Sequence, residues 1–147
     1  MKIDPEEYKR LKQLKMECLE YAETNFRGKS FKNISSGHDI QVSKKGLNEW
    51  FSKSKSEEQI LSIKSLDTIL INAVYSHSSE NTKNQEKNAP TYEYYYYPIT
   101  LNNSFYTIIM TVRIIKEGND DKFIYYHHYL DNVYIKKRAT LKYTSQP

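Results

Sequence analysis

The chain has 147 residues, enough for one domain that buries most of the surface its unfolded form exposes. Its 22 Lys and Arg residues against 18 Asp and Glu residues give a formal net charge of +4, which permits a phosphate-bearing partner without requiring one. A single cysteine, Cys18, excludes an internal disulfide and a cysteine-based zinc site. No apolar run has the length of a signal peptide or a membrane span, so we expect a cytoplasmic protein with no membrane partner.

The first predicted element is a helix from Pro5 to about Phe26. Asp4 suits the capping position, Pro5 suits the first helical position, and Glu7 can reach back to the cap. Apolar residues then recur at steps of three and four, at Leu11, Leu14, Cys18, Tyr21, Ala22 and Phe26. This spacing predicts one buried stripe in which Cys18 is a buried thiol, and Gly28 is expected to end the helix.

Residues 31–42 predict a short β-hairpin. Four apolar residues flank the turn-forming pair Ser36-Gly37, namely Phe31, Ile34, Ile40 and Val42. Ser43, Lys44 and Lys45 follow before Gly46. On a hairpin beside the sheet these polar residues would help to close a site, and the alternative is an ordinary exposed turn.

A second helix is predicted to begin at Ser56, which is followed by Glu57, Glu58 and Gln59 in the pattern of a capping box. Its apolar positions continue through Val74, so we expect this helix to be buried, with His77 just after its end. Residues 76–90 are polar and lack large apolar side chains. They predict a mobile surface connector.

Three strands are predicted in the second half, at about 92–99, 105–116 and 122–135, with short turns between them. Helices followed by hairpin-connected strands indicate an α+β fold, with N-terminal helices packed on a C-terminal antiparallel meander. We expect one domain over residues 1–147, made of an N-terminal helix (1–28), a core (30–135) and a basic tail (136–147). Most of the 14 tyrosines lie in the strand-rich half, where strand packing is their expected use and stacking on bases is the alternative.

The histidines of the last strand form an adjacent pair. Neighbouring residues on a strand point to opposite faces, so His127 and His128 are not expected to bind one metal ion. The same alternation places His128 on a face with Tyr126 and Leu130 and leaves His127 as a structural or solvated residue on the other. A strand histidine is usually structural, and a functional role is the alternative.

The preceding strand separates into an apolar and a mixed face. Its apolar face comprises Tyr106, Ile108, Met110, Val112 and Ile114. Arg113 therefore points away from the helix-covered core. An arginine on an open sheet face is either solvated or a ligand for phosphate.

Two blocks of residues carry a family resemblance. The first has Phe31, Asn33, Ser36, Gly37, Val42, Ser43, Gly46 and Leu47, and the second has Tyr126, His128 and Leu130. In this order, with a helix and a hairpin between them, they resemble the phage- and mobile-element-associated nuclease-like domains of the barnase, EndoU, colicin and RelE superfamily. Such domains occur within large polyvalent proteins. The resemblance covers about residues 30–135.

The resemblance implies a toxin-like endoribonuclease that cleaves RNA, with tRNA among the candidate substrates, without a metal or other cofactor. The ribose 2′-hydroxyl attacks the neighbouring phosphate, which requires a base, an acid and cations. The implied acid or base is His128, with His38 or His77 as its partner. Arg113 and Lys44 or Lys45 would stabilise the phosphate charge, while Ser43, Tyr126 and Lys53 would bind the substrate.

One departure from the family pattern favours an alternative function. Asn48 and Glu49 stand where the pattern carries lysines. The alternative is a catalytically inactive module of the same fold that engages nucleic acid or a protein partner. A third alternative is a small inhibitor whose tyrosine-rich sheet contacts a protein. If the chain is a toxin, an immunity protein is its expected protein partner.

Overall fold

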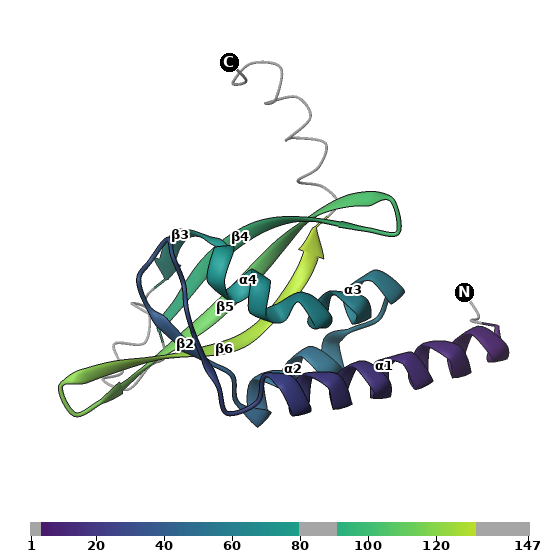
Figure 1. Ribbon diagram of the computed structural model, residues 1–147, viewed down its shortest axis with the longest axis horizontal. Coiled ribbons are helices and arrows are strands. Elements are labelled where there is room, and N and C mark those ends of the chain that lie inside the picture. The colour runs from purple at the N-terminus through teal and green to yellow at the C-terminus, as the bar shows by residue number, and fades with distance from the viewer. Residues whose placement is uncertain (1–3, 80–90, 132–147) are drawn as a thin grey trace, which may run out of the picture.

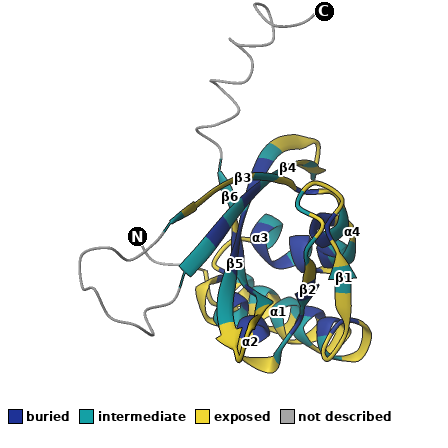
Figure 2. Ribbon diagram, turned by 90° about the vertical axis from the view of Figure 1, so that its left-hand side faces the viewer, coloured by how far each residue is buried: buried dark blue, intermediate teal, exposed yellow. Residues whose placement is uncertain are grey.

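A six-stranded sheet with helices against one of its faces organises the chain in the computed structural model, which describes residues 4–79 and 91–131 (Figures 1 and 2). The strands are β1 (Ser30–Lys32), β2 (Asp39–Gln41), β3 (Val74–Ser79), β4 (Thr91–Leu101), β5 (Ser104–Glu117) and β6 (Asp120–Asp131). Their order across the sheet is β1-β2-β6-β5-β4-β3. The predicted α+β class is confirmed. The sheet is larger than the predicted meander, and it is mixed because β2 runs parallel to β6.

The helical part consists of α1 (Pro5–Asn25), α2 (Lys44–Lys53), α3 (Glu57–Leu61), the 3-10 turn η1 (Ser62–Ser65) and α4 (Leu66–Asn72). Among the helices that the structure describes, none combines the length and the apolar character needed to cross a bilayer. The predicted basic tail, 136–147, and residues 132–135 of the last predicted strand lie outside the described residues.

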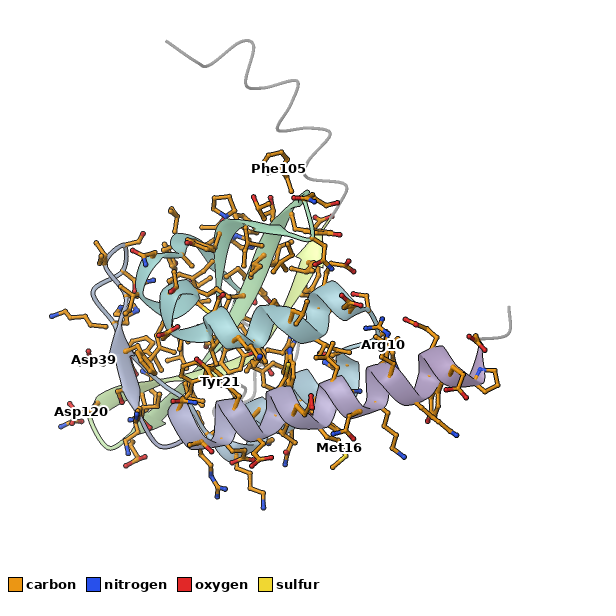
Figure 3. All side chains as sticks on the ribbon, turned by 45° about the vertical axis from the view of Figure 1, so that its right-hand side comes forward. Arg10, Met16, Tyr21, Asp39, Phe105 and Asp120 are labelled. Atoms are coloured by element: carbon orange, nitrogen blue, oxygen red, sulfur yellow. The ribbon has the colours of Figure 1, made fainter. Side chains whose placement is uncertain are left out.

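Helix α1 forms where the sequence predicts it. The Asp4 side chain accepts a hydrogen bond from the Glu6 backbone N–H (3.4 Å), and Cys18 is fully buried, as expected. Glu7 binds Arg10 rather than the cap. Arg10 also contacts Glu57 (2.6 Å), which ties α1 to the start of α3 (Figure 3).

Helix α2 was not predicted, and the placement of Lys44 and Lys45 on a hairpin is wrong. The Ser43 side chain caps α2 by accepting from the Gly46 N–H (3.2 Å), so both lysines lie exposed in the first helical turn. Leu47 and Trp50 are fully buried. Their spacing of three, next to a capping serine, is typical of a helix. The two lysines before a glycine indicated a turn instead, so the helix was missed.

The second predicted helix begins where the sequence predicts it, but its predicted end is wrong. Ser56 caps it by accepting from the Gln59 N–H (3.1 Å). The helix then breaks into α3, η1 and α4, because Ser62 donates to the Gln59 carbonyl oxygen and competes with regular helical bonding. Val74 begins strand β3 and is 59% exposed, so residues 76–79 are strand rather than connector. The rest of the predicted connector, 80–90, lies outside the described residues.

The meander β4–β5–β6 is confirmed, but β6 carries an irregularity that changes its faces. Val112 pairs with Tyr125 and Thr111 pairs with His127, so Tyr126 is an extra residue in β6. The bulge places Tyr125 and His128 on the same helix-covered face, where both are buried. The prediction that His128 shares a face with Tyr126 is therefore wrong.

Candidate functional site

His128 lies in the core of the domain. It is 2% exposed, its Nδ1 lies 2.7 Å from the Tyr125 hydroxyl, and its Nε2 lies 2.7 Å from Ser62 Oγ. Ser62 already donates its hydroxyl proton to the Gln59 carbonyl oxygen, so Nε2–H donates to Ser62 and Nδ1 accepts from Tyr125. Burial lowers the pKa of His128 to about 3, and the neighbouring His127 contributes to the decrease. The ring is neutral, and both of its nitrogens are engaged within the protein.

Gln59 seals the edge of β6 beside this histidine. Its side-chain amide donates to the His128 carbonyl oxygen (2.7 Å) and accepts from the Leu130 N–H (3.0 Å). The amide thus takes the place of a neighbouring strand at two backbone groups that would otherwise be unpaired. Hydrogen bonds consequently hold His128 in place at both its side chain and its backbone.

The other predicted site residues do not gather around His128. Arg113 lies on the opposite sheet face, since it pairs with Tyr92 and Ile124 beyond the bulge. Lys44 and Lys45 are exposed at the start of α2, and Ser43 is occupied as its cap. His77 lies on β3 rather than after a helix and stacks on Tyr94 with 4.9 Å between ring centroids.

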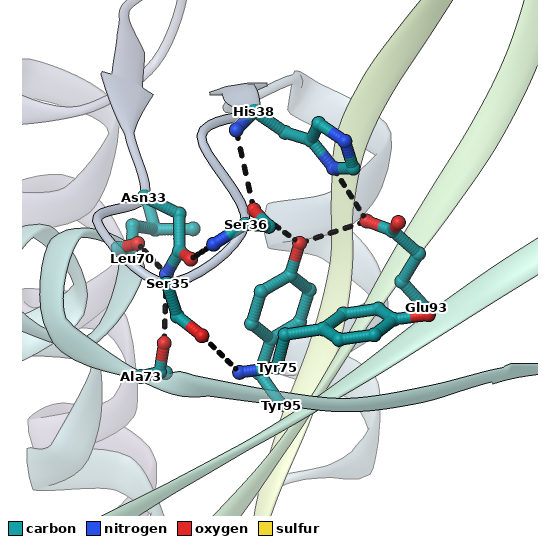
Figure 4. A network of polar contacts seen from close by, with 9 residues as sticks. All are labelled: Asn33, Ser35, Ser36, His38, Leu70, Ala73, Tyr75, Glu93 and Tyr95. Carbon is teal, nitrogen blue, oxygen red and sulfur yellow. Dashed lines mark hydrogen bonds and ion pairs between the residues drawn. The ribbon is translucent and has the colours of Figure 1, made fainter.

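His38 belongs to a separate polar network at the tip of the β1–β2 hairpin (Figure 4). Its Nδ1 lies 3.1 Å from the buried Glu93 carboxylate, which also accepts a hydrogen bond from the Tyr95 hydroxyl (2.7 Å). Asn33 donates to the backbone carbonyl oxygens of Leu70 and Ala73, at 2.8 Å each. These contacts fasten the hairpin tip to α4 and β4. Burial raises the pKa of the Tyr95 hydroxyl, so Tyr95 remains a proton donor.

The sheet face opposite the helices carries rings from neighbouring strands. We call it the aromatic face and define it by Tyr92, Tyr94, Tyr96, Arg113, Tyr126, His127 and Tyr129. The register brings these side chains together, because Tyr94, Thr111 and His127 form one row across the sheet and Tyr96, Ile109 and Tyr129 form the next. Seen edge-on, the described helices all lie on the other side of the sheet (Figure 2).

Close ring contacts connect the aromatic face. The ring centroids of Tyr92 and Tyr126 are 5.8 Å apart, and those of Tyr126 and His127 are 5.0 Å apart. Tyr129 is 46% exposed. Arg113 adds a guanidinium whose Nε is buried without a hydrogen-bond partner among the described residues. The face therefore combines flat rings with a cation.

A pocket of about 330 Å³ opens at the side of this face, between β6 and the connection from α2 to α3. Lys53, Lys55 and Ser56 line it on one side, and His127 and Tyr129 on the other. Lys53 Nζ also lies 5.5 Å from the centre of the Tyr126 ring. Burial lowers the pKa of His127, and Lys53 lowers it further while Glu49 opposes the change. His127 is thus neutral at pH 7.

Comparison with known families identifies the chain. Residues 9–136 match the model of large polyvalent protein-associated domain 3. The chain belongs to this family. Membership of the large polyvalent protein-associated domain 3 family supports the predicted phage- or mobile-element-associated type of domain, and it carries no assignment to the nuclease superfamily. No curated protein and no protein of solved structure is detectably similar to the chain.

Proposed function

We propose that this large polyvalent protein-associated domain binds single-stranded RNA across the aromatic face. The observation that carries the proposal is the set of tyrosine rings on the sheet face away from the described helices. Bases stack on such rings whatever their sequence, and each stack contributes about 1–3 kcal/mol to binding. Sheet faces with exposed aromatic residues are a recurrent solution for this purpose.

The charges on and beside the aromatic face suit a nucleic-acid backbone. Arg113 stands between Tyr92 and Ile124 in the register, and Lys53 reaches over Tyr126 from the end of α2. A guanidinium binds phosphate with paired, directional hydrogen bonds. The chain as a whole is positively charged, at +4. These features favour the nucleic-acid form of the binding module over its protein-binding form.

Removing two tyrosines is expected to weaken RNA binding strongly. Because each lost stack costs at least about 1 kcal/mol, Tyr92→Ala combined with Tyr94→Ala should lower the affinity about 30-fold or more. Fluorescence polarisation with a labelled homopolymer RNA measures this, and circular dichroism verifies that the variant is folded. Tyr8→Ala is the control, because Tyr8 is 56% exposed on α1, away from the sheet.

Two results would count against RNA binding by this face. One is an unchanged affinity in the double variant, and the other is no binding by the wild-type domain at low salt. A stoichiometric protein that binds the wild-type domain and not the double variant would assign the aromatic face to protein recognition instead.

RNA cleavage is the second candidate function, and the position of His127 favours it. His127 and Arg113 project from neighbouring strands on the same face, two residues apart in register. A neutral imidazole takes the proton of a ribose 2′-hydroxyl, and a guanidinium stabilises the charge that develops on the phosphate. The 2′-oxygen then bonds to phosphorus as the bond from phosphorus to the 5′-oxygen breaks, the 5′-oxygen takes a proton from water, and a cyclic phosphate remains. His127 thus replaces the buried His128 in the predicted role.

Incubation of RNA with the domain in the presence of a chelator tests cleavage. We expect cyclic-phosphate ends in the products and at least a hundredfold lower rate for His127→Ala, which is the usual contribution of acid–base catalysis. Tyr8→Ala, on α1 away from the sheet, should cleave at nearly the wild-type rate. If no cyclic phosphate forms even with the protein in excess over RNA, the domain is a binding module only.

A further inference from the structure

A pocket beside the aromatic face has the chemistry of a phosphate site. We propose that the pocket between β6 and the α2–α3 connection binds a backbone phosphate of the RNA strand that lies on the aromatic face. The inference rests on the proposed RNA binding and deepens it, because it names the place beside the aromatic face where the RNA backbone is bound. Its lining includes Lys53, Lys55, Ser56 and His127.

The charge around the pocket is one-sided. Of the residues that the structure describes, two lysines line it and no carboxylate does. Glu49 engages Lys53, since its carboxylate lies 3.3 Å from Lys53 Nζ in a partly exposed pair one helical turn away. Exposed pairs of this kind contribute little stability, so a phosphate is able to replace Glu49 as the partner of Lys53.

The floor of the pocket is held in place by hydrogen bonds within the protein. Gln59 and His128 contribute to the floor, and the Gln59 amide and both His128 ring nitrogens are committed to hydrogen bonds within the protein. The groups left to bind a ligand are therefore those of the walls. They are two ammonium groups, the hydroxyls of Ser56 and Tyr129, and the imidazole of His127, all of which donate to phosphate oxygens.

The size and position of the pocket indicate part of a polymer rather than a free metabolite. At about 330 Å³ it lies at the small end of the range for ligand pockets. Lys53 lines the pocket and also contacts the aromatic face, since its ammonium lies over the Tyr126 ring. His127 likewise forms a wall of the pocket and part of the row with Thr111 and Tyr94. A strand with bases on the rings would thus place its backbone at the lysines.

Salt dependence tests the pocket directly. Neutralising one phosphate of a single strand adds about 0.7 to the slope of log K against log salt, so Lys53→Ala with Lys55→Ala, which removes the one phosphate contact of the pocket, should reduce the slope by about 0.7. At about 0.1 M salt this corresponds to roughly fivefold weaker binding of a homopolymer RNA. Lys9→Ala with Lys12→Ala is the control, because it removes the same charge from exposed positions of α1.

The outcomes separate this inference from the proposed function. If the wild type binds RNA and the pocket variant keeps the slope of the control, the pocket is excluded while the aromatic face stands. If the wild type does not bind RNA, both fail. Equal losses in the pocket variant and the control indicate a general charge effect and also exclude the pocket.

A titration of His127 gives a second readout that does not depend on a variant. Burial, Lys53 and Glu49 act on its pKa in the free domain, and the other titratable groups that line the pocket are Lys55, His128 and Tyr129. A phosphate beside the ring favours the imidazolium, so the homopolymer RNA should raise the pKa of His127, as followed by NMR. An unchanged pKa with RNA bound would overturn the phosphate site.

Discussion

Replacing Gly46 with alanine is expected to lower the free energy of unfolding by about 3 kcal/mol. A Cβ at this position would lie 2.2 Å from the backbone oxygen of Tyr125, and backbone moves less easily than a side chain. Helix α2 would have to shift away from β6. Alanine is the better helix former by about 1 kcal/mol, but this gain is smaller than the cost of the clash.

Urea unfolding of Gly46→Ala and of a matched variant measures the effect. Asn48→Ala is the control, since Asn48 is exposed on the same helix and alanine there should be neutral or slightly stabilising. A loss below about 0.5 kcal/mol in Gly46→Ala would show that α2 does not pack closely against Tyr125. The result bears on function, because α2 ends at Lys53 and Tyr125 holds His128.

Gly46 also illustrates why the sequence did not reveal α2. Glycine within a helix is unfavourable, so two lysines before a glycine indicate a turn. The reason for glycine here is a close approach to β6, and this contact spans about 80 positions of the chain. Local patterns predicted α1 and the meander because capping, periodicity and short turns are local properties. A contact between distant segments leaves no such pattern.

The candidate site was predicted in part, for the same physical reason. Strict alternation along β5 placed Arg113 on the open face correctly. The residues that it placed on the opposite, helix-covered face include three that are fully buried, namely Ile108, Met110 and Val112. Alternation failed on β6, where the bulge at Tyr126 exchanges the faces after it. Nothing in the run of aromatic residues marks that bulge. Glu93, the buried partner of His38, lies 55 residues away from it and was missed altogether.

The pH dependence of stability is expected to show whether His128 is structural. Its pKa is about 3 in the folded chain and has its ordinary value of 6.5 once unfolded, so between these values only the unfolded chain binds the proton. The free energy of unfolding therefore rises with pH through this window. The contribution of His128 is present in full above about pH 6.5. Between pH 7 and pH 5 the free energy of unfolding should fall by about 2 kcal/mol from this group.

Urea unfolding at several pH values measures this contribution in the wild type and in His128→Gln. The two proteins are compared by the slope of the free energy of unfolding against pH, and not by their absolute stability. The slope should largely disappear in the variant, with a smaller part remaining because His127 also has a lowered pKa. Asn48→Ala, which removes no titratable group from an exposed position of α2, should keep the wild-type slope. If His128→Gln keeps it as well, His128 titrates freely in the folded chain. It would then regain the proton-transfer role that its resemblance to the nuclease motif implies, and the case for His127 as the proton acceptor would weaken correspondingly.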